Sequence, residues 1–267
     1  MRIRATVAAV TGALALSALA VPAAQAAGNP LSGVTFSNVV INSGKNIVVG
    51  ASAMVTVSAS YTVTHPASLS ASAFMSGPLI YRGTAISDEN AVILGGDEPG
   101  TCTASSSTVL KCTAKIQFRP DATGDHDDLA NSHAGAWKVG AVAVDNSDHF
   151  KWQSDLGAQK VQRLSKLTVD AAPEPVKKGK TVTVTGALTR ANWDSHTYQG
   201  YTGQSVKLQF RKAGSSTYTT LKTVTTDSHG NLKTTTTATA DGYFRYSFAG
   251  TTTTPAVSAA GDYVDVQ

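Results

Sequence analysis

The chain has 267 residues, of which 42% are hydrophobic and only 15% are charged. Its formal net charge of +4 is too small to indicate a nucleic-acid-binding protein. The charge is unevenly spread, because residues 27–162 hold 8 basic and 11 acidic residues (net −3) and residues 163–267 hold 12 and 7 (net +5). This change of character predicts two parts that meet near residue 162.

The first 26 residues have the three parts of a secretory signal peptide. Arg2 and Arg4 form a positive start, residues 5–21 are apolar, and Ala24-Gln25-Ala26 is an A-x-A cleavage signature. An N-terminal membrane anchor is the alternative, but about 17 apolar residues are at the short limit for crossing a bilayer. We therefore expect cleavage after Ala26 and a secreted, extracellular protein with no membrane contact after cleavage.

The rest of the chain reads as β-structure, with no long amphipathic helical pattern. Residues 53–63 place Val55, Val57, Ala59, Tyr61 and Val63 on one face and polar side chains on the other, which is the period of a half-buried strand. The same criteria predict strands at 34–40, 47–63, 79–81, 91–94, 109–118 and 137–144, and then at 167–169, 182–188, 206–210, 218–225, 232–238, 243–248 and 263–266. Seven short strands in the second half, separated by turn residues, predict a β-sandwich.

The chain contains two cysteines, Cys102 and Cys112. In an exported protein an even pair predicts a disulfide. Gly100 and the serines of residues 105–107 indicate a turn, so the pair is expected to bridge two antiparallel strands. A redox or metal role would need partners at ligand spacing, and none is nearby.

Residues 205–224, 227–232 and 240–246 carry a recognisable pattern. Two adjacent strands are followed by a D-x-x-G turn (Asp227 to Gly230) and a Gly-Tyr-Phe-Arg strand start at Gly242. This pattern resembles the bacterial immunoglobulin-like modules of actinobacterial exported proteins, some of which are labelled calcium-binding. The resemblance covers residues 165–267 and implies a fold, but it implies no activity, because such modules serve many roles.

We therefore predict an all-β protein with two tandem immunoglobulin-like antiparallel β-sandwich domains after a signal peptide. The predicted divisions are 1–26 for the signal peptide, 27–162 for an N-terminal sandwich with one disulfide, and 163–267 for the C-terminal immunoglobulin-like domain.

One candidate site is acidic. Calcium prefers six to eight oxygen ligands, and closely spaced carboxylates on a loop can supply several of them. A solvated loop is the simpler interpretation, since the EF-hand pattern is not met. If calcium is the cofactor, the candidate ligands are Asp121, Thr123, Asp125, Asp127, Asp128, Asp145 and Asp148.

The second candidate site is the aromatic segment of residues 192–201. Aromatic rings among hydrogen-bonding side chains are suited to stacking on sugars. The alternative is that Trp193 and Tyr201 cover the end of the sandwich core. The candidate ligand-binding residues are Trp193, Tyr198, Tyr201, Arg190 and Arg211, and the expected partner is a cell-wall polysaccharide or another surface protein.

No catalytic pattern stands out. Asp194-Ser195-His196 and Asp227-Ser228-His229 hold the residue types of a hydrolytic triad, but adjacent residues cannot adopt triad geometry among themselves. No G-x-S-x-G sequence occurs. The sequence therefore favours a secreted, non-enzymatic binding or structural protein. The alternatives are extracellular calcium binding and polysaccharide binding, and a hydrolase is the least favoured class.

Overall fold

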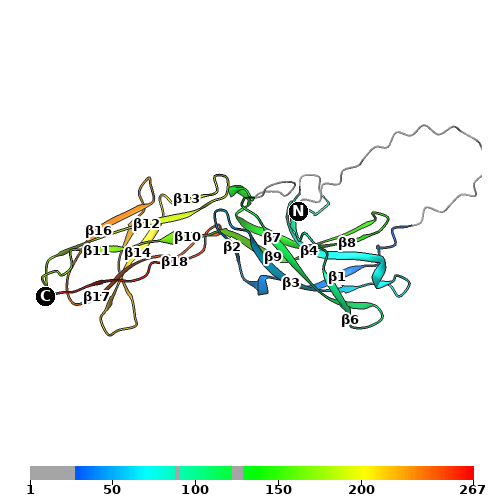
Figure 1. The fold of residues 1–267 in the computed structure, drawn as a ribbon, viewed down its shortest axis with the longest axis horizontal. Helices are drawn as coiled ribbons and strands as arrows, with labels where there is room; N and C mark the ends of the chain where they lie inside the picture. Colours follow the sequence, from blue (N-terminus) through cyan, green and yellow to red (C-terminus); the bar gives the residue numbers. More distant parts are fainter. Residues whose placement is uncertain (1–27, 88–90, 122–128) are drawn as a thin grey trace, which may run out of the picture. The chain divides into compact units, whose positions relative to one another are not determined.

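The structure is a computed structural model that describes residues 28–87, 91–121 and 129–267 (Figure 1). Within these ranges the regular structure consists of strands β1 to β19 and three 3-10 turns, η1 (Asn42–Gly44), η2 (Ala71–Ala73) and η3 (Asn131–His133). No helix in the described part of the chain has the length and hydrophobicity needed to cross a membrane. The protein is therefore all-β, as its composition predicts.

Contacts within the chain define two compact units. The first contains the residues up to Lys45, 56–117 and 137–159, and the second contains 46–55, 118–136 and 160–267. Strand β9 runs across the division at Lys160, close to the predicted boundary at residue 162. Two segments that the sequence assigns to the N-terminal domain belong to the second unit, which is therefore built from three stretches of chain.

The first unit contains an antiparallel sheet of order β1-β3-β7-β6. Its strands are β1 (Thr35–Ile41), β3 (Val55–Thr64), β7 (Val109–Phe118) and β6 (Thr101–Ala104). The strand predicted at 47–63 is divided in the structure, because the chain bends after β2 (Ile47–Val49) and β3 starts only at Val55. The alternation predicted for β3 is confirmed, since Val57, Ala59, Tyr61 and Val63 are buried.

A second sheet has the order β2-β9-β8-β4-β5. Its other strands are β9 (Phe150–Arg163), β8 (Gly135–Asp145), β4 (Phe74–Arg82) and β5 (Val92–Gly95). Strand β2 pairs in parallel with the end of β9 that belongs to the second unit, at Ile47 and Val161. The core of the first unit joins both sheets, because Phe36 and Val63 cluster with Phe74 and Ala141. The first unit is therefore a β-sandwich.

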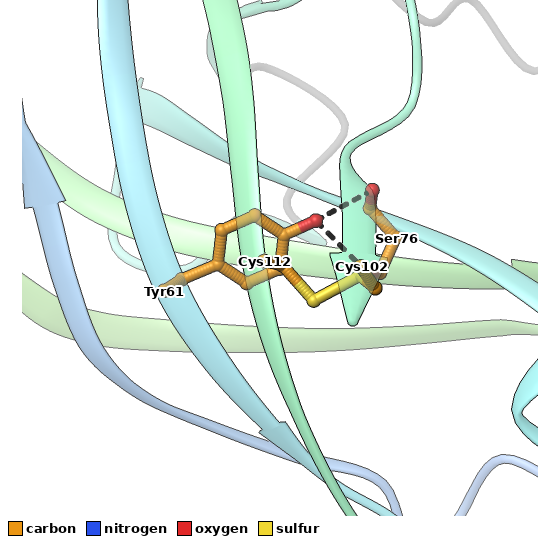
Figure 2. Close-up of a disulfide and its surroundings, with 4 residues drawn as sticks. All are labelled: Tyr61, Ser76, Cys102 and Cys112. Atoms are coloured by element: carbon orange, nitrogen blue, oxygen red, sulfur yellow. Dashed lines mark hydrogen bonds between the residues drawn. A yellow bond between two sulfur atoms is a disulfide. The ribbon is translucent and has the colours of Figure 1, made fainter. Parts of the chain in front are cut away.

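The predicted disulfide is confirmed (Figure 2). Cys102 on β6 and Cys112 on β7 are directly opposite each other in the antiparallel register. The buried Tyr61 hydroxyl donates to the Ser76 carbonyl oxygen at 2.9 Å, and the Gly100 N–H donates to the same oxygen at 2.8 Å. Burial raises the pKa of Tyr61, and the hydrogen bond to Ser76 opposes this only in part. The chain leading into the disulfide hairpin is thus held against β4 of the opposite sheet.

Replacing both Cys102 and Cys112 with alanine is expected to destabilise the first unit by roughly 2–3 kcal/mol. The disulfide closes a short loop and restricts the unfolded chain, and its loss removes that restriction. Urea unfolding of the wild type and the double variant would measure the difference. Reduced wild-type protein is the control and should match the variant. An unchanged unfolding midpoint in the variant would contradict the prediction.

The second unit contains two further sheets. In the first sheet β12 pairs antiparallel with all four of its neighbours. The strands of this sheet are β10 (Ser165–Leu167), β11 (Asp170–Ala172), β12 (Thr181–Asn192), β13 (Thr197–Gly200) and β16 (Asn231–Thr237). The second sheet has the order β15-β14-β17-β18, with β19 also paired to β17. Its strands are β14 (Ser205–Lys212), β15 (Thr219–Thr225), β17 (Gly242–Phe248), β18 (Val257–Ser258) and β19 (Asp262–Val264).

The two sheets of the second unit enclose one apolar core. Val184 and Leu188 of β12 pack in the same cluster as Leu208 of β14 and Phe244 and Tyr246 of β17. The chain passes between the sheets after β13, after β15 and after β16. Two antiparallel sheets joined by such crossings form an immunoglobulin-like sandwich. Strand β15 pairs with β14 rather than β16, so the sandwich differs from the antibody constant type.

Candidate binding face on the second unit

The acidic candidates are only partly within the described chain. Thr123, Asp125, Asp127 and Asp128 lie outside the described residues. Asp121 is exposed and belongs to the second unit, whereas Asp145 and Asp148 belong to the first. No group of three or more histidine, cysteine or acidic side chains suited to a metal ion occurs among the residues described. Calcium binding therefore stays a prediction from the sequence.

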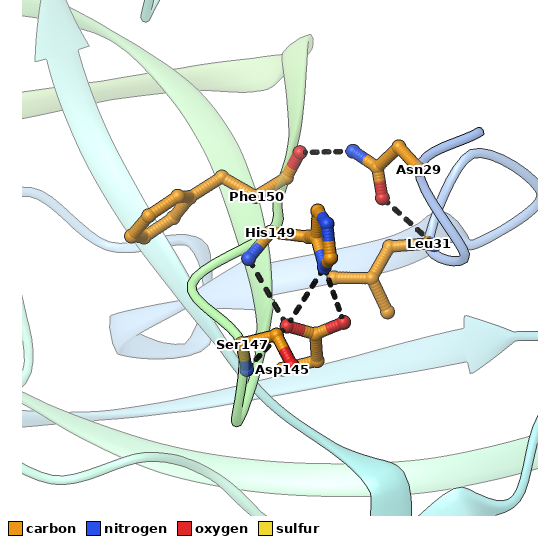
Figure 3. A network of polar contacts seen from close by, with 6 residues as sticks. All are labelled: Asn29, Leu31, Asp145, Ser147, His149 and Phe150. Atoms are coloured by element: carbon orange, nitrogen blue, oxygen red, sulfur yellow. Dashed lines mark hydrogen bonds and ion pairs between the residues drawn. The ribbon is translucent and has the colours of Figure 1, made fainter. Parts of the chain in front are cut away.

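The Asp145 carboxylate is occupied by its own turn (Figure 3). It accepts hydrogen bonds from the backbone N–H groups of Ser147 at 2.9 Å and His149 at 3.0 Å, and the His149 ring lies 2.9 Å from its other oxygen. Burial raises the pKa of Asp145, but these hydrogen bonds outweigh burial and hold the pKa below its ordinary value. The charge of Asp145 thus stabilises the turn between β8 and β9.

The aromatic segment predicted to bind sugars forms a β-hairpin, in which β12 pairs with β13. Trp193 at its tip is completely buried, and its indole N–H donates to the Gly50 carbonyl oxygen at 2.8 Å. The Trp193 backbone N–H donates to the Asn131 side chain at 2.9 Å. The prediction that Trp193 stacks on a ligand is therefore wrong, because neither ring face is open to solvent. Trp193 instead joins the three chain segments of the second unit.

Two further aromatic candidates of this hairpin also have internal roles. Tyr201 is 9% exposed, and the Arg190 guanidinium lies over its ring at 3.9 Å. Tyr198 is half-buried beneath the Lys166 ammonium group at 3.6 Å, and burial raises its pKa. Cation–π contacts of this kind stabilise the hairpin. They also cover the ring surfaces that a sugar would need.

A buried cation lies beneath the same hairpin. Arg163 is 7% exposed, and its Nε–H donates to the Ala191 carbonyl oxygen at 2.6 Å. Burial lowers the pKa of Arg163, and the neighbouring Arg190 lowers it further, to about 10. Arg163 therefore still carries its charge at neutral pH, and it fixes the edge of β12.

Arg211, the fifth candidate, lies away from this hairpin. It is near the far end of β14, six residues beyond Ser205, which corresponds to about 20 Å along an extended strand. There its side chain contacts two tyrosines that the sequence did not single out. The guanidinium lies 4.0 Å from the ring centroid of Tyr243 and 5.3 Å from that of Tyr218. The structure thus separates the predicted candidates into two groups.

Arg211 belongs to a row of five side chains that we name the aromatic–arginine face. Its members are Arg211, Tyr218, Tyr243, Arg245 and Tyr263. They come from β14, β17, β19 and the segment before β15, on the side of the sheet opposite the core. None of the five is fully buried, and Tyr263 is 39% exposed. The face therefore presents rings and guanidinium groups to solvent.

Two acidic side chains, Asp241 and Asp265, lie near Tyr263 of this face. Burial raises the pKa of Tyr263, and the nearby Asp241 and Asp265 raise it further. Arg211 and Arg245 themselves have no carboxylate within ion-pair distance among the residues that the structure describes. The aromatic–arginine face is therefore acidic near Tyr263 and the start of β17, and it is most basic towards Arg245.

A signal for this face was present in the sequence. Strand β17 alternates buried Phe244, Tyr246 and Phe248 with half-buried Tyr243 and Arg245. Tyrosine and arginine are enriched at binding interfaces, so their presence on the solvent side of a strand can mark a binding surface. Their meeting with Arg211 depends on strand pairing, in which Arg211 is opposite Tyr243. A list of residue types along the chain does not contain that information.

No protein-family model matches the chain, and no curated protein matches it. Among solved structures, dimeric latent PorU from Porphyromonas gingivalis is 11% identical, with a TM-score of 0.29 over 87% of this chain and 20% of that one. The chain thus spans only a small part of the PorU chain. The teleost fish polymeric Ig receptor ectodomain is 13% identical, with a TM-score of 0.22 over 83% of this chain and 95% of that one.

The D00-D0 domain of intimin is also similar, at 13% identity and a TM-score of 0.27 over 85% of this chain and 98% of that one. Similarities this low carry no argument about function. The class of the protein follows instead from its own sheets and cores. It is an all-β protein of immunoglobulin-like sandwiches with one disulfide.

Proposed function

We propose that the protein is a secreted, non-enzymatic binding protein of the cell surface, and that its second unit binds polysaccharide through the aromatic–arginine face. The observation that carries the proposal is the gathering of three tyrosines and two arginines on one solvent-facing side of a sheet. Export is supported by the signal-type sequence of residues 1–26.

The chemistry of the face suits a polar polymer. The arginines offer several N–H donors to hydroxyl and acidic groups, and the tyrosines hold these arginines in place and add their own hydroxyl groups. Four of the five side chains come from strands β14, β17 and β19, and Tyr218 directly precedes β15, so the binding groups are held by the sheet. A strand-built surface of this kind can follow an extended chain without closing around it.

A pull-down of the full-length protein with purified cell-wall polysaccharide tests the proposal. The double variant Arg211→Ala/Tyr218→Ala is expected to lose most of the retention, because it interrupts the middle of the face. Tyr198→Ala is the matched control. Tyr198 is also a half-buried tyrosine with a cation over its ring, but it belongs to the β12–β13 hairpin and not to the aromatic–arginine face. Loss of retention in Tyr198→Ala alone would assign the site to the hairpin and contradict the proposal.

A further inference from the structure

We infer that the aromatic–arginine face selects polysaccharides that carry acidic groups along the chain, with Arg211 and Arg245 each holding one acidic group of the same polymer. This inference rests on the proposed function and specifies its ligand. It depends on three properties of the face: the order of its five side chains, the unused N–H donors of its arginines, and the distance between the two arginines.

The five side chains form a continuous row of two tyrosines, an arginine, a tyrosine and an arginine. The Tyr263 and Tyr243 ring centroids are 5.1 Å apart, and the Arg211 guanidinium lies 4.0 Å from Tyr243. Tyr218 follows, with Arg211 at 5.3 Å and Arg245 at 3.7 Å from its ring centroid. A guanidinium held against a ring loses little additional freedom when it binds. Both arginines are thus ordered before a ligand arrives.

The contacts within this row also determine which side-chain surfaces remain accessible to a ligand. Tyr218 and Tyr243 already use ring surface to contact guanidinium groups. Stacking of a neutral sugar on these rings would have to displace an arginine. The N–H edges of the arginines remain available, and such edges form bidentate hydrogen bonds with carboxylate and phosphate groups. The face is therefore better suited to acidic groups than to neutral sugar rings.

Few of the arginine donors are used within the protein. Arg211 donates from Nη1 to the Ser215 carbonyl oxygen at 2.6 Å, and Arg245 donates from Nε to the Gln209 side chain at 2.8 Å. Each guanidinium carries five N–H donors, so most of them remain for a ligand. No described carboxylate within ion-pair distance competes for them.

The position of the two arginines indicates a polymer rather than a single anion. Arg211 is opposite Tyr243 and Arg245 is opposite Gln209, so the arginines are diagonal neighbours on adjacent strands. Diagonal neighbours of this kind are about 7–8 Å apart, with their Cβ atoms somewhat closer. Two cations at this distance can each bind a different acidic group of one chain. Asp241, which directly precedes β17, and Asp265 would repel the same chain, so it should lie towards Tyr218 and Arg245.

The test uses the full-length protein and two forms of one polymer, polygalacturonate and its fully methyl-esterified form, which lacks the charge. Wild-type protein is expected to bind polygalacturonate at least about tenfold more tightly than the ester, because charge-assisted hydrogen bonds exceed neutral ones by that factor or more. Arg211→Gln and Arg245→Gln should each weaken polygalacturonate binding by about tenfold. Thermal melting confirms that each variant is folded.

Two further variants separate geometry from charge. Lys233→Gln removes one positive charge from exposed β16, which belongs to the opposite sheet, and should leave binding unchanged. The double variant Arg211→Lys/Arg245→Lys keeps both charges but cannot form bidentate hydrogen bonds. Its affinity for polygalacturonate should therefore fall between those of the wild type and the glutamine variants. Equal losses in Lys233→Gln and Arg245→Gln would overturn the inference.

The remaining outcomes distinguish the inference from the proposed function. Equal binding of polygalacturonate and its ester would overturn the acidic selection and leave polysaccharide binding intact. Equal binding of single-stranded DNA would overturn polysaccharide selection, because any polyanion would then suffice. If neither polymer is bound and wall polysaccharide is not retained, the proposed function falls together with the inference.

Discussion

Replacement of Trp193 by alanine is expected to destabilise the second unit by about 3–5 kcal/mol. The Trp193 side chain has no exposed surface, and its indole N–H is bonded to the Gly50 carbonyl oxygen. Alanine would leave a large cavity and remove that hydrogen bond. The effect should be large because Trp193 connects β12 with the segments of residues 46–55 and 118–136.

Urea unfolding, followed by circular dichroism, measures this loss. Trp193→Phe is the control that keeps most of the apolar volume and removes only the N–H donor, so it should cost clearly less than alanine. Binding of polysaccharide at a temperature where the variant is folded should be unchanged, because Trp193 is not part of the aromatic–arginine face. If Trp193→Ala lowered the unfolding free energy by less than about 1 kcal/mol, the result would contradict the burial of the Trp193 side chain.

Strands with one buried face were predictable from sequence, and strands with mixed surroundings were not. Strands β3 and β17 follow a period of two, because one side of each meets an apolar core. Strand β9 was missed over its whole length. Its buried residues include Gln159, Gln162 and Arg163, whose polar groups bond to backbone carbonyl oxygens. Hydrophobic periodicity cannot detect a strand whose buried side chains are polar.

The candidate site could be predicted only in part, for a different reason. Aromatic residues predict either a binding surface or a core, and residue type alone does not separate the two. Trp193 is buried because it meets Gly50, which is 143 residues away in the sequence. Arg211 is exposed because its strand position points away from the core, where Tyr218 and Tyr243 accompany it. Contacts of this range depend on strand order, which the sequence alone did not specify.

Replacement of Tyr246 by alanine is expected to cost the second unit about 3–5 kcal/mol as well. Tyr246 is completely buried in β17, and its hydroxyl donates to the Val184 carbonyl oxygen of the opposite sheet at 2.9 Å. Its ring packs close to Gly186, where an added Cβ atom would lie 2.9 Å from a ring carbon. Tyr246→Phe keeps the packing and should cost about 0.5–1.5 kcal/mol, the net contribution of one hydrogen bond.

The pH dependence of stability gives an independent test of the Tyr246 environment. Burial raises the pKa of the Tyr246 hydroxyl from 10.0 to about 12. The folded protein therefore holds this proton more tightly than the unfolded chain does. The contribution of Tyr246 is fully present below pH 10 and is lost as the pH rises from 10 towards 12. The difference in unfolding free energy between wild type and Tyr246→Phe should shrink over this range, and a constant difference would contradict the buried hydroxyl.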